Sequence, residues 1–187
     1  RFLHAIPKCR VQIVDGADDA FSSKGSTSQT LTDKWLGVGM HVVGLRFRGV
    51  KIPQGAAIAK ATLKICAHSA GCEAEVDGLL KGEAADNPAA FATDSRIVGA
   101  LPTTTASKAW KWVGPEDDPW TANAWYESPD IAAVVQEIVN RPGWTSDNAL
   151  VVLYTFNQMT WGDERRFWSF NGDPTKAAKL VITYQPK

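Results

Sequence analysis

Apolar and polar residues alternate with a period of two along two neighbouring stretches of the chain, residues 42–50 and residues 61–67. This alternation is typical of β-strands that bury one face against a core. A turn is predicted between them at residues 53–55, Pro-Gln-Gly, because proline fixes φ and glycine accepts a positive φ. The two stretches therefore predict a pair of strands joined by a short connection.

The run ALVVLYTF at residues 149–156 is apolar almost throughout. It is too short for a typical helix and rich in β-forming residues, which indicates a central strand covered on both faces. Residues 9–14 and 179–184 are predicted to be the first and last strands. Strands of this kind separated by turns are typical of an all-β sandwich or barrel.

One short amphipathic helix is predicted at about residues 129–141. Ser128 suits the N-terminal cap, Pro129 the first helical position, and Asp130 the positive end of the helix. The Pro-Gly pair at 142–143 ends the helix. The apolar positions form a single stripe: Ile131, Val134, Val135, Ile138 and Val139. We expect this helix to lie across the end of the sandwich.

The stretch from residue 84 to residue 126 is long and irregular, and within it residues 108–113 are compatible with a short strand. Long ordered loops with aromatic residues are often functional. This stretch carries five aromatic side chains of interest: Trp110, Trp112, Trp120, Trp125 and Tyr126. We interpret it as an aromatic-rich loop insertion within one domain over residues 1–187, a length that suits a single β-sandwich.

The charge balance narrows the classes of partner. Lys plus Arg and Asp plus Glu each number 20, so the formal net charge is zero. A neutral chain has no overall attraction for nucleic acid, and it lacks the net repulsion that opposes homo-oligomers. No apolar run reaches the roughly 18 residues of a membrane span, so no membrane insertion is expected.

Several segments occur in the order found in a known family. They are residues 18–21 (DDAF), 36–39 (LGVG), 43–50 (VGLRFRGV), 52–58 (IPQGAAI), 61–65 (ATLKI), 167–174 (FWSFNGDP) and 178–184 (AKLVITY). In this order they resemble the DNRLRE-type jelly-roll domains, which are related to carbohydrate-binding modules of bacterial polysaccharide-degrading enzymes. The resemblance covers about residues 11–185 and implies an all-β jelly-roll β-sandwich in a secreted or cell-surface protein.

The three cysteines are Cys9, Cys66 and Cys72. The secreted location that the resemblance implies favours a disulfide, and a Cys66–Cys72 bond across the intervening turn is our first choice. Cys9 paired with either of the others is an alternative, as are three buried thiols.

Calcium is the metal that the sequence favours most, in a structural site. Jelly-roll binding modules often hold one calcium ion, which takes its oxygen ligands from carboxylates and loop carbonyls. The acidic stretch beside the first strand supplies the candidate ligands Asp15, Asp18 and Asp19.

The eight tryptophans suggest a binding site for a polysaccharide or other glycan, because the C–H faces of sugars lie flat on aromatic rings. Alternation places Arg166 and Trp168 on one face of a strand and Arg165 and Phe167 on the other. An arginine beside a tryptophan can bind a carboxylate, so an acidic polysaccharide is one candidate. The predicted ligand-binding residues are Trp110, Trp112, Trp120, Trp125, Tyr126, Trp161, Arg166 and Trp168.

No catalytic motif accompanies these residues. The sequence lacks G-x-S-x-G, H-E-x-x-H and phosphate-binding glycine motifs, and its acidic loop residues are interpreted as solvated charge. The leading prediction is a non-catalytic carbohydrate-binding module. The alternatives are a structural or adhesive extracellular spacer, a binder of an apolar small molecule such as a pigment in a Trp-lined pocket, and a glycosidase or lyase.

Overall fold

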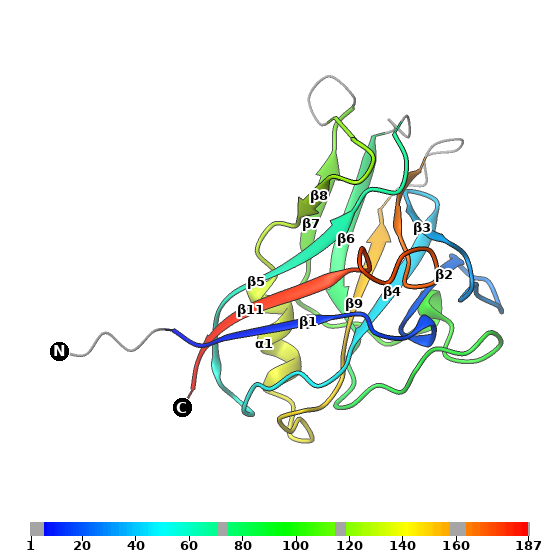
Figure 1. The fold of residues 1–187 in the computed structure, drawn as a ribbon. Coiled ribbons are helices and arrows are strands. Elements are labelled where there is room, and N and C mark those ends of the chain that lie inside the picture. Colours follow the sequence, from blue (N-terminus) through cyan, green and yellow to red (C-terminus); the bar gives the residue numbers. More distant parts are fainter. Residues whose placement is uncertain (1–5, 71–74, 115–118, 158–163, 187) are drawn as a thin grey trace.

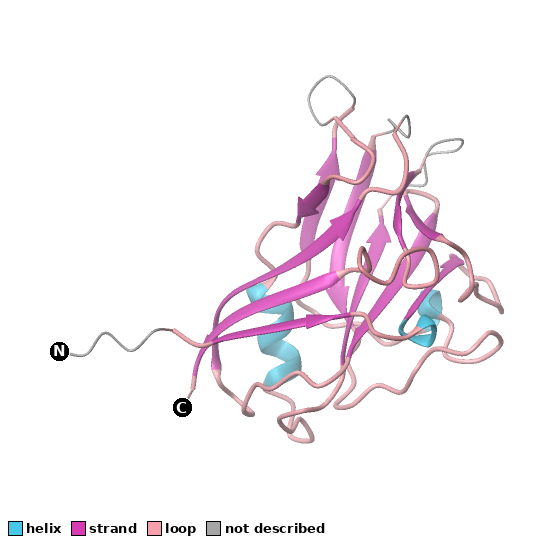
Figure 2. Cartoon of the chain, viewed as in Figure 1, coloured by secondary structure: helices cyan, strands magenta, loops and turns pink. Residues whose placement is uncertain are grey.

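The computed structural model describes residues 6–70, 75–114, 119–157 and 164–186. These residues form an all-β fold with one α-helix and two short 3₁₀ helices (Figures 1 and 2). The elements in chain order are β1 (Lys8–Gln12), η1 (Gly16–Asp18), β2 (Asp19–Ser23), β3 (Trp35–Val38), β4 (His41–Phe47), β5 (Ala57–Cys66), β6 (Val76–Gly82), η2 (Val98–Ala100), β7 (Lys108–Trp112), β8 (Trp125–Glu127), α1 (Ala132–Val139), β9 (Leu150–Phe156), β10 (Arg165–Trp168) and β11 (Lys179–Gln185).

The strands build a four-stranded sheet in the order β1-β11-β5-β8, a five-stranded sheet in the order β2-β4-β9-β6-β7, and a two-stranded ribbon of β10 and β3. Every strand pair is antiparallel. The predicted all-β class is therefore confirmed, and the arrangement is consistent with a β-sandwich. The jelly-roll topology stays a prediction.

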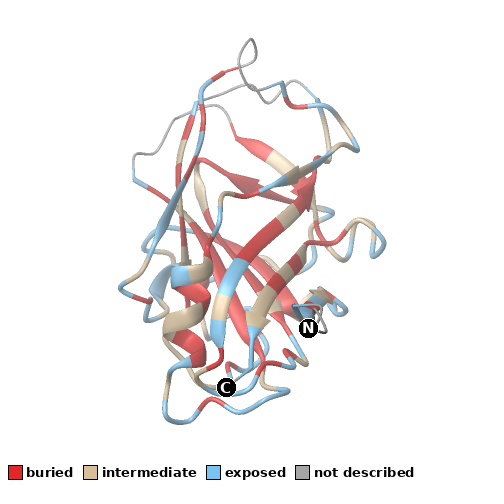
Figure 3. Ribbon diagram, turned by 90° about the vertical axis from the view of Figure 1, so that its left-hand side faces the viewer, coloured by how far each residue is buried: buried red, intermediate tan, exposed pale blue. Residues whose placement is uncertain are grey.

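The core lies between the two larger sheets. Each alternating strand sends one set of side chains inward, as Leu45 and Phe47 of β4 and Leu63 of β5 do, and these residues are fully buried. β9 occupies the middle of the five-stranded sheet, and Leu150 to Tyr154 are all buried, which confirms the predicted central strand. Figure 3 shows buried residues along the strands and on one side of α1.

The helix begins later than predicted, at Ala132 instead of Pro129. The expected cap residues have other partners, because they join the helix to β5. The Ser128 hydroxyl accepts a hydrogen bond from the Leu63 backbone N–H (2.9 Å), and Asp130 accepts from Ala61 and Ala132 (2.9 Å each). The predicted apolar stripe is buried as expected. Among the described residues, no helix is long and apolar enough to cross a membrane.

The stretch predicted as a loop insertion contains β7 and β8, and much of its remainder covers the outer face of the five-stranded sheet. Phe91 and Val98 form a second, smaller buried cluster there with Val42, Val151 and Leu153, among others. This long segment is thus a layer of the fold, and only part of its aromatic content faces solvent.

Gly44 of β4 makes the close approach of this covering segment possible. A Cβ atom at Gly44 would collide with the side chains of Val98 and Phe91. Gln29 holds the segment from the other side: its amide donates to the carbonyls of Ala92 (2.7 Å) and Arg96 (3.1 Å) and accepts from Val98 N–H (2.9 Å).

Candidate functional site

Three of the predicted sugar-binding tryptophans lie in the core. Trp110, Trp112 and Trp120 are 5%, 6% and 4% exposed, and they pack with Tyr126 and Tyr154 in edge-to-face and stacked contacts. Such rings have no open face for a sugar. The prediction that these three form an open platform is corrected accordingly, because they fill the end of the sandwich core.

The indole N–H groups of Trp112 and Trp120 and the Tyr154 hydroxyl are hydrogen-bonded within the protein. Trp112 Nε1–H donates to the Tyr154 hydroxyl (3.0 Å), which donates to the Trp110 carbonyl (2.8 Å), and Trp120 Nε1–H donates to the Arg166 carbonyl (3.2 Å). Burial raises the pKa of Tyr154, so its hydroxyl remains a donor at all ordinary pH values. The cluster serves as an anchor for the fold.

Three other tryptophans remain accessible, and a cation lies over each ring. Lys179 Nζ is 4.1 Å from the ring centroid of Trp125, which is 41% exposed. The remaining pairs are Lys176 Nζ with Trp168 at 4.8 Å and the Arg166 guanidinium with Trp35 at 4.1 Å. We call these six residues the Trp–cation row. Trp35 and the two lysines were not predicted from the sequence, because their positions beside these rings depend on tertiary contacts.

The ribbon of β3 and β10 orients one end of this row. Trp168 pairs directly with Trp35 across the ribbon, so both rings lie on the same face. Arg165 and Phe167 are fully buried, whereas Arg166 and Trp168 are half-buried. The predicted alternation along this strand is therefore confirmed.

The other end of the row lies on the same outer side of the molecule. Ala67 pairs with Phe167, and both side chains are buried. Their neighbours along each strand, Cys66 and Trp168, therefore point to the outer side. Trp125 pairs with Cys66 across β5 and β8. The short segment around Ala67 thus connects the two ends of the row.

The environment of Trp168 is electropositive. The His68 ring lies 4.4 Å from the Trp168 ring, and Trp168 Nε1–H donates to Asn123 Oδ1 (3.2 Å). Burial lowers the pKa of His68, and the charges of Arg166, Lys176 and Lys34 lower it further. Three cations acting on one imidazole make this end of the row attractive to anions.

Two acidic groups pair with cations of the row: Asp173 lies 3.1 Å from Lys176 Nζ, and Glu164 is bound to Arg166. The Glu164 carboxylate accepts from Arg166 Nε (2.7 Å) and lies 3.2 Å from His41 Nδ1. Burial opposes ionisation of Glu164, but the hydrogen bonds from His41 and Arg166 prevail and lower its pKa. Gly37 leaves the space for this carboxylate, since a Cβ there would overlap it. Glu164 holds Arg166 in place over Trp35.

A second electropositive region adjoins the row on the outer face of the four-stranded sheet. Strand register places its members on one side of the sheet. The residues that define this basic face are Lys8, Arg10, Lys60, Thr62, Lys64, Lys179, Val181, Thr183 and Glu127. Among these nine, five are cations and one, Glu127, is an acid.

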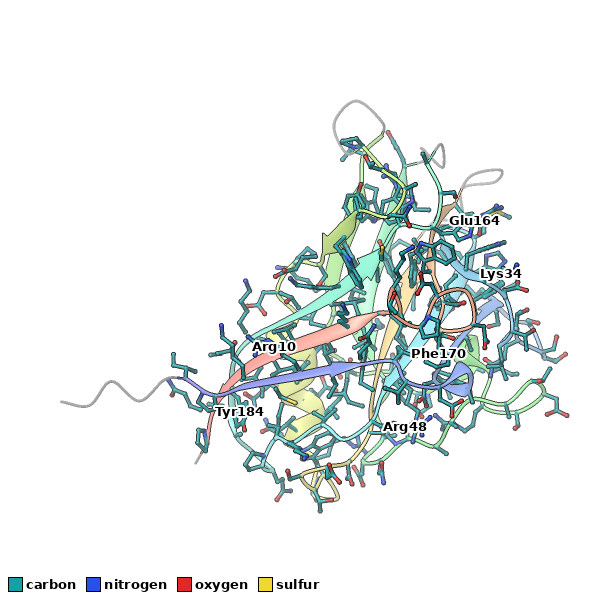
Figure 4. All side chains as sticks on the ribbon, viewed as in Figure 1. Arg10, Lys34, Arg48, Glu164, Phe170 and Tyr184 are labelled. Carbon is teal, nitrogen blue, oxygen red and sulfur yellow. The ribbon has the colours of Figure 1, made fainter. Side chains whose placement is uncertain are left out.

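The basic face contains a shallow groove of about 270 Å³, lined by eight of these residues. Glu127 lies within it, 2.9 Å from Lys64 and 3.8 Å from Lys60, and the hydrogen bond from Lys64 lowers the pKa of Glu127. In Figure 4, the labelled Arg10 lies among the side chains of β1 and β11, whereas Lys34 and Glu164 lie toward β3. The face and the row together give an accessible, cationic surface that carries aromatic rings.

The acidic stretch predicted to hold calcium is engaged with arginines instead. Asp18 is fully buried and accepts from Arg46 and Arg48 (2.5 Å each), and Asp15 accepts from Arg48 (2.9 Å). Burial raises the pKa of Asp19 to about 7. No cluster of three or more His, Cys, Asp or Glu in the described ranges is placed to hold a metal ion. Calcium binding stays a prediction without support from this geometry.

The predicted disulfide is corrected. Cys66 is a free, buried thiol, and so is Cys9. Cys9 pairs with Ile182 on the core side of the sheet, whereas Cys66 points to the outer side, so the two cannot meet. Burial raises the pKa of both thiols, which makes them poor nucleophiles. Cys72 and Trp161 lie outside the described residues.

A scan against models of protein families finds no match to this chain, and a search of curated proteins finds no similar sequence. The family resemblance of its segments stays a prediction.

Proposed function

We propose that this domain is a non-catalytic module that binds an acidic polysaccharide along the basic face and the Trp–cation row. The observation that carries the proposal is that each accessible tryptophan of the row has a cation over its ring. An extracellular location, where such polymers occur, is part of the proposal.

The cations favour an acidic glycan over a neutral one. A neutral sugar that stacks on Trp125 must displace the ammonium group of Lys179, 4.1 Å above the ring. A carboxylate or sulfate group of an acidic sugar can instead pair with that ammonium while the sugar ring contacts the indole. Lys176 lies over Trp168 in the same way, but its ammonium already pairs with Asp173 (3.1 Å), so Trp125 with Lys179 is the stronger candidate contact.

The strand geometry suits a polymer. Side chains two residues apart on a strand lie about 7 Å apart, and neighbouring strands lie about 5 Å apart. Lys8 and Arg10 are so related on β1, and Lys60 and Lys64 occupy the same face of β5. An extended chain that carries one charge per sugar can therefore meet several cations at once, which increases affinity through many weak contacts.

Single substitutions test this assignment with polygalacturonate as the ligand. Lys179→Gln removes the ammonium over Trp125, and Trp125→Ala removes the ring. Each is expected to weaken binding about three- to tenfold in isothermal titration, since an exposed charge pair contributes about 1 kcal/mol. Lys108→Gln is the matched control, because Lys108 is an exposed lysine on β7, at the edge of the other sheet.

Thermal unfolding of each variant shows whether its fold is retained. If Lys179→Gln and Trp125→Ala both bind polygalacturonate as tightly as the unchanged protein, the Trp–cation row is not the binding surface.

A further inference from the structure

A separate groove lies on the outer face of the five-stranded sheet, on the other side of the sandwich from the basic face. Its volume is about 260 Å³. Leu79 of β6 and Leu101 are partly exposed and contribute apolar surface, Val42 and Leu153 lie buried beneath them, and Lys24 and Lys81 line the groove as well. The groove is thus apolar in part and carries two positive charges.

We propose that this groove binds a small organic monoanion with an apolar body, such as a medium-chain carboxylate. The apolar body would lie on Leu79 and Leu101, and the acid group would pair with Lys24 and Lys81. This site is independent of the proposed polysaccharide binding, because it uses a different sheet and none of the same residues.

The charge of the groove supports an anion. None of its lining residues is acidic, and neither Lys24 nor Lys81 forms an ion pair with a described residue. The other lining residues with polar side chains are Thr103, Thr155 and Asn157, which are neutral. A ligand carboxylate would therefore supply the missing counter-charge, and partial exclusion of water would strengthen its pairing with the lysines.

One wall of the groove is held in place by buried hydrogen bonds. Val98 N–H donates to the side-chain oxygen of Gln29 (2.9 Å), and Gln29 is 6% exposed. The adjacent Gly99 N–H donates to the Ser22 hydroxyl (3.3 Å). A fixed wall reduces the entropy lost on binding, so a weakly held small molecule can still bind specifically.

The size of the groove sets the class of ligand. Sites for drug-sized molecules run from about 300 to 1,000 Å³. A groove of about 260 Å³ therefore suits a shorter compound. An aliphatic acid of about eight carbons is long enough to contact the apolar residues of the groove while its acid group reaches the lysines. Octanoate is therefore the probe.

The experiment titrates the full chain with octanoate and with 1-octanol while amide NMR shifts are recorded. Octanol has the same alkyl chain without the charge. We expect saturable shifts at Leu79, Gly99 and Thr155 with octanoate, and binding of octanol at least about fivefold weaker. Lys24→Met and Lys81→Met are each expected to weaken octanoate about three- to tenfold, whereas Lys108→Met is expected to leave it unchanged.

Thr155→Phe is a second variant that fills the groove without removing a lysine, and it should abolish the octanoate shifts. The proposal is overturned if octanol binds as well as octanoate, if the shifts map to other surfaces, or if Lys81→Met and Lys108→Met behave alike.

Discussion

Asp19 shows how one buried carboxyl group shapes the response of the molecule to pH. It is 1% exposed, accepts a hydrogen bond from Phe170 N–H (2.7 Å), and has a second oxygen without a described partner. Burial raises its pKa to about 7, and the neighbouring Asp18 adds to the rise. The folded protein therefore keeps a proton that the unfolded chain releases at lower pH.

The sign of this effect follows from linkage. The raised pKa stabilises the fold fully below about pH 4, and the stabilisation is lost as pH rises through about 7. Asp19→Asn keeps an acceptor for Phe170 N–H but cannot ionise. We predict that its free energy of unfolding changes less between about pH 5 and pH 8 than that of the unchanged protein, by up to about 3 kcal/mol.

Urea unfolding at several pH values measures this difference. Asp173→Asn is the control, since Asp173 is a more exposed acid whose hydrogen bonds lower its pKa. Parallel pH profiles for the unchanged protein and Asp19→Asn would contradict this role for Asp19.

Contacts of individual residues explain why the sequence identified only part of the candidate site. Trp125, Trp168 and Arg166 were predicted to bind ligand, and they are exposed or half-buried, but they were predicted together with Trp110, Trp112 and Trp120, which are buried. The sequence alone does not distinguish a tryptophan in the core from a tryptophan on a binding surface. The difference arises from strand pairing, which places Tyr154 and Arg165 against the buried rings.

At the scale of elements, strands with a clear alternating or continuous apolar pattern were predicted closely, and a strand without one was not. The central strand β9 and the last strand β11 lie within one residue of the predicted ranges. β6 was missed because its sequence VDGLLKG contains two glycines. Gly78 is needed there, since a Cβ would collide with Tyr154. Tertiary packing therefore requires a glycine that weakens the strand pattern in the sequence.

The covering segment over the five-stranded sheet depends on a similar approach at Gly44. We predict that Gly44→Ala lowers the free energy of unfolding by about 1–3 kcal/mol, because the added methyl group collides with Phe91 and Val98. It should also speed proteolysis of residues 84–107. Chemical denaturation and limited proteolysis measure the two effects.

Gly99→Ala is the control in the same segment, since a Cβ there would come within 3.4 Å of the Ser22 hydroxyl alone, at 3.2 Å. Equal stability and equal proteolysis rates for the two variants would show that the covering segment does not rely on the small size of Gly44.

At the scale of the whole molecule, a net charge of zero conceals an uneven distribution. The basic face carries five cations and one acid, while the sequence as a whole has equal numbers of each. Strand register gathers the cations, because Lys8, Lys60 and Lys179 come from distant parts of the chain. The sequence total therefore could not show where an anionic polymer would bind.

The most direct test compares polygalacturonate with its methyl ester, which has the same sugar chain without the charge. Titration of the domain at about 20 mM and about 500 mM salt should give saturable binding of the acid, binding of the ester at least about tenfold weaker, and a marked loss of affinity for the acid at high salt. Equal binding of acid and ester, affinity that does not change with salt, or tighter binding of single-stranded DNA than of the acidic glycan would contradict the account.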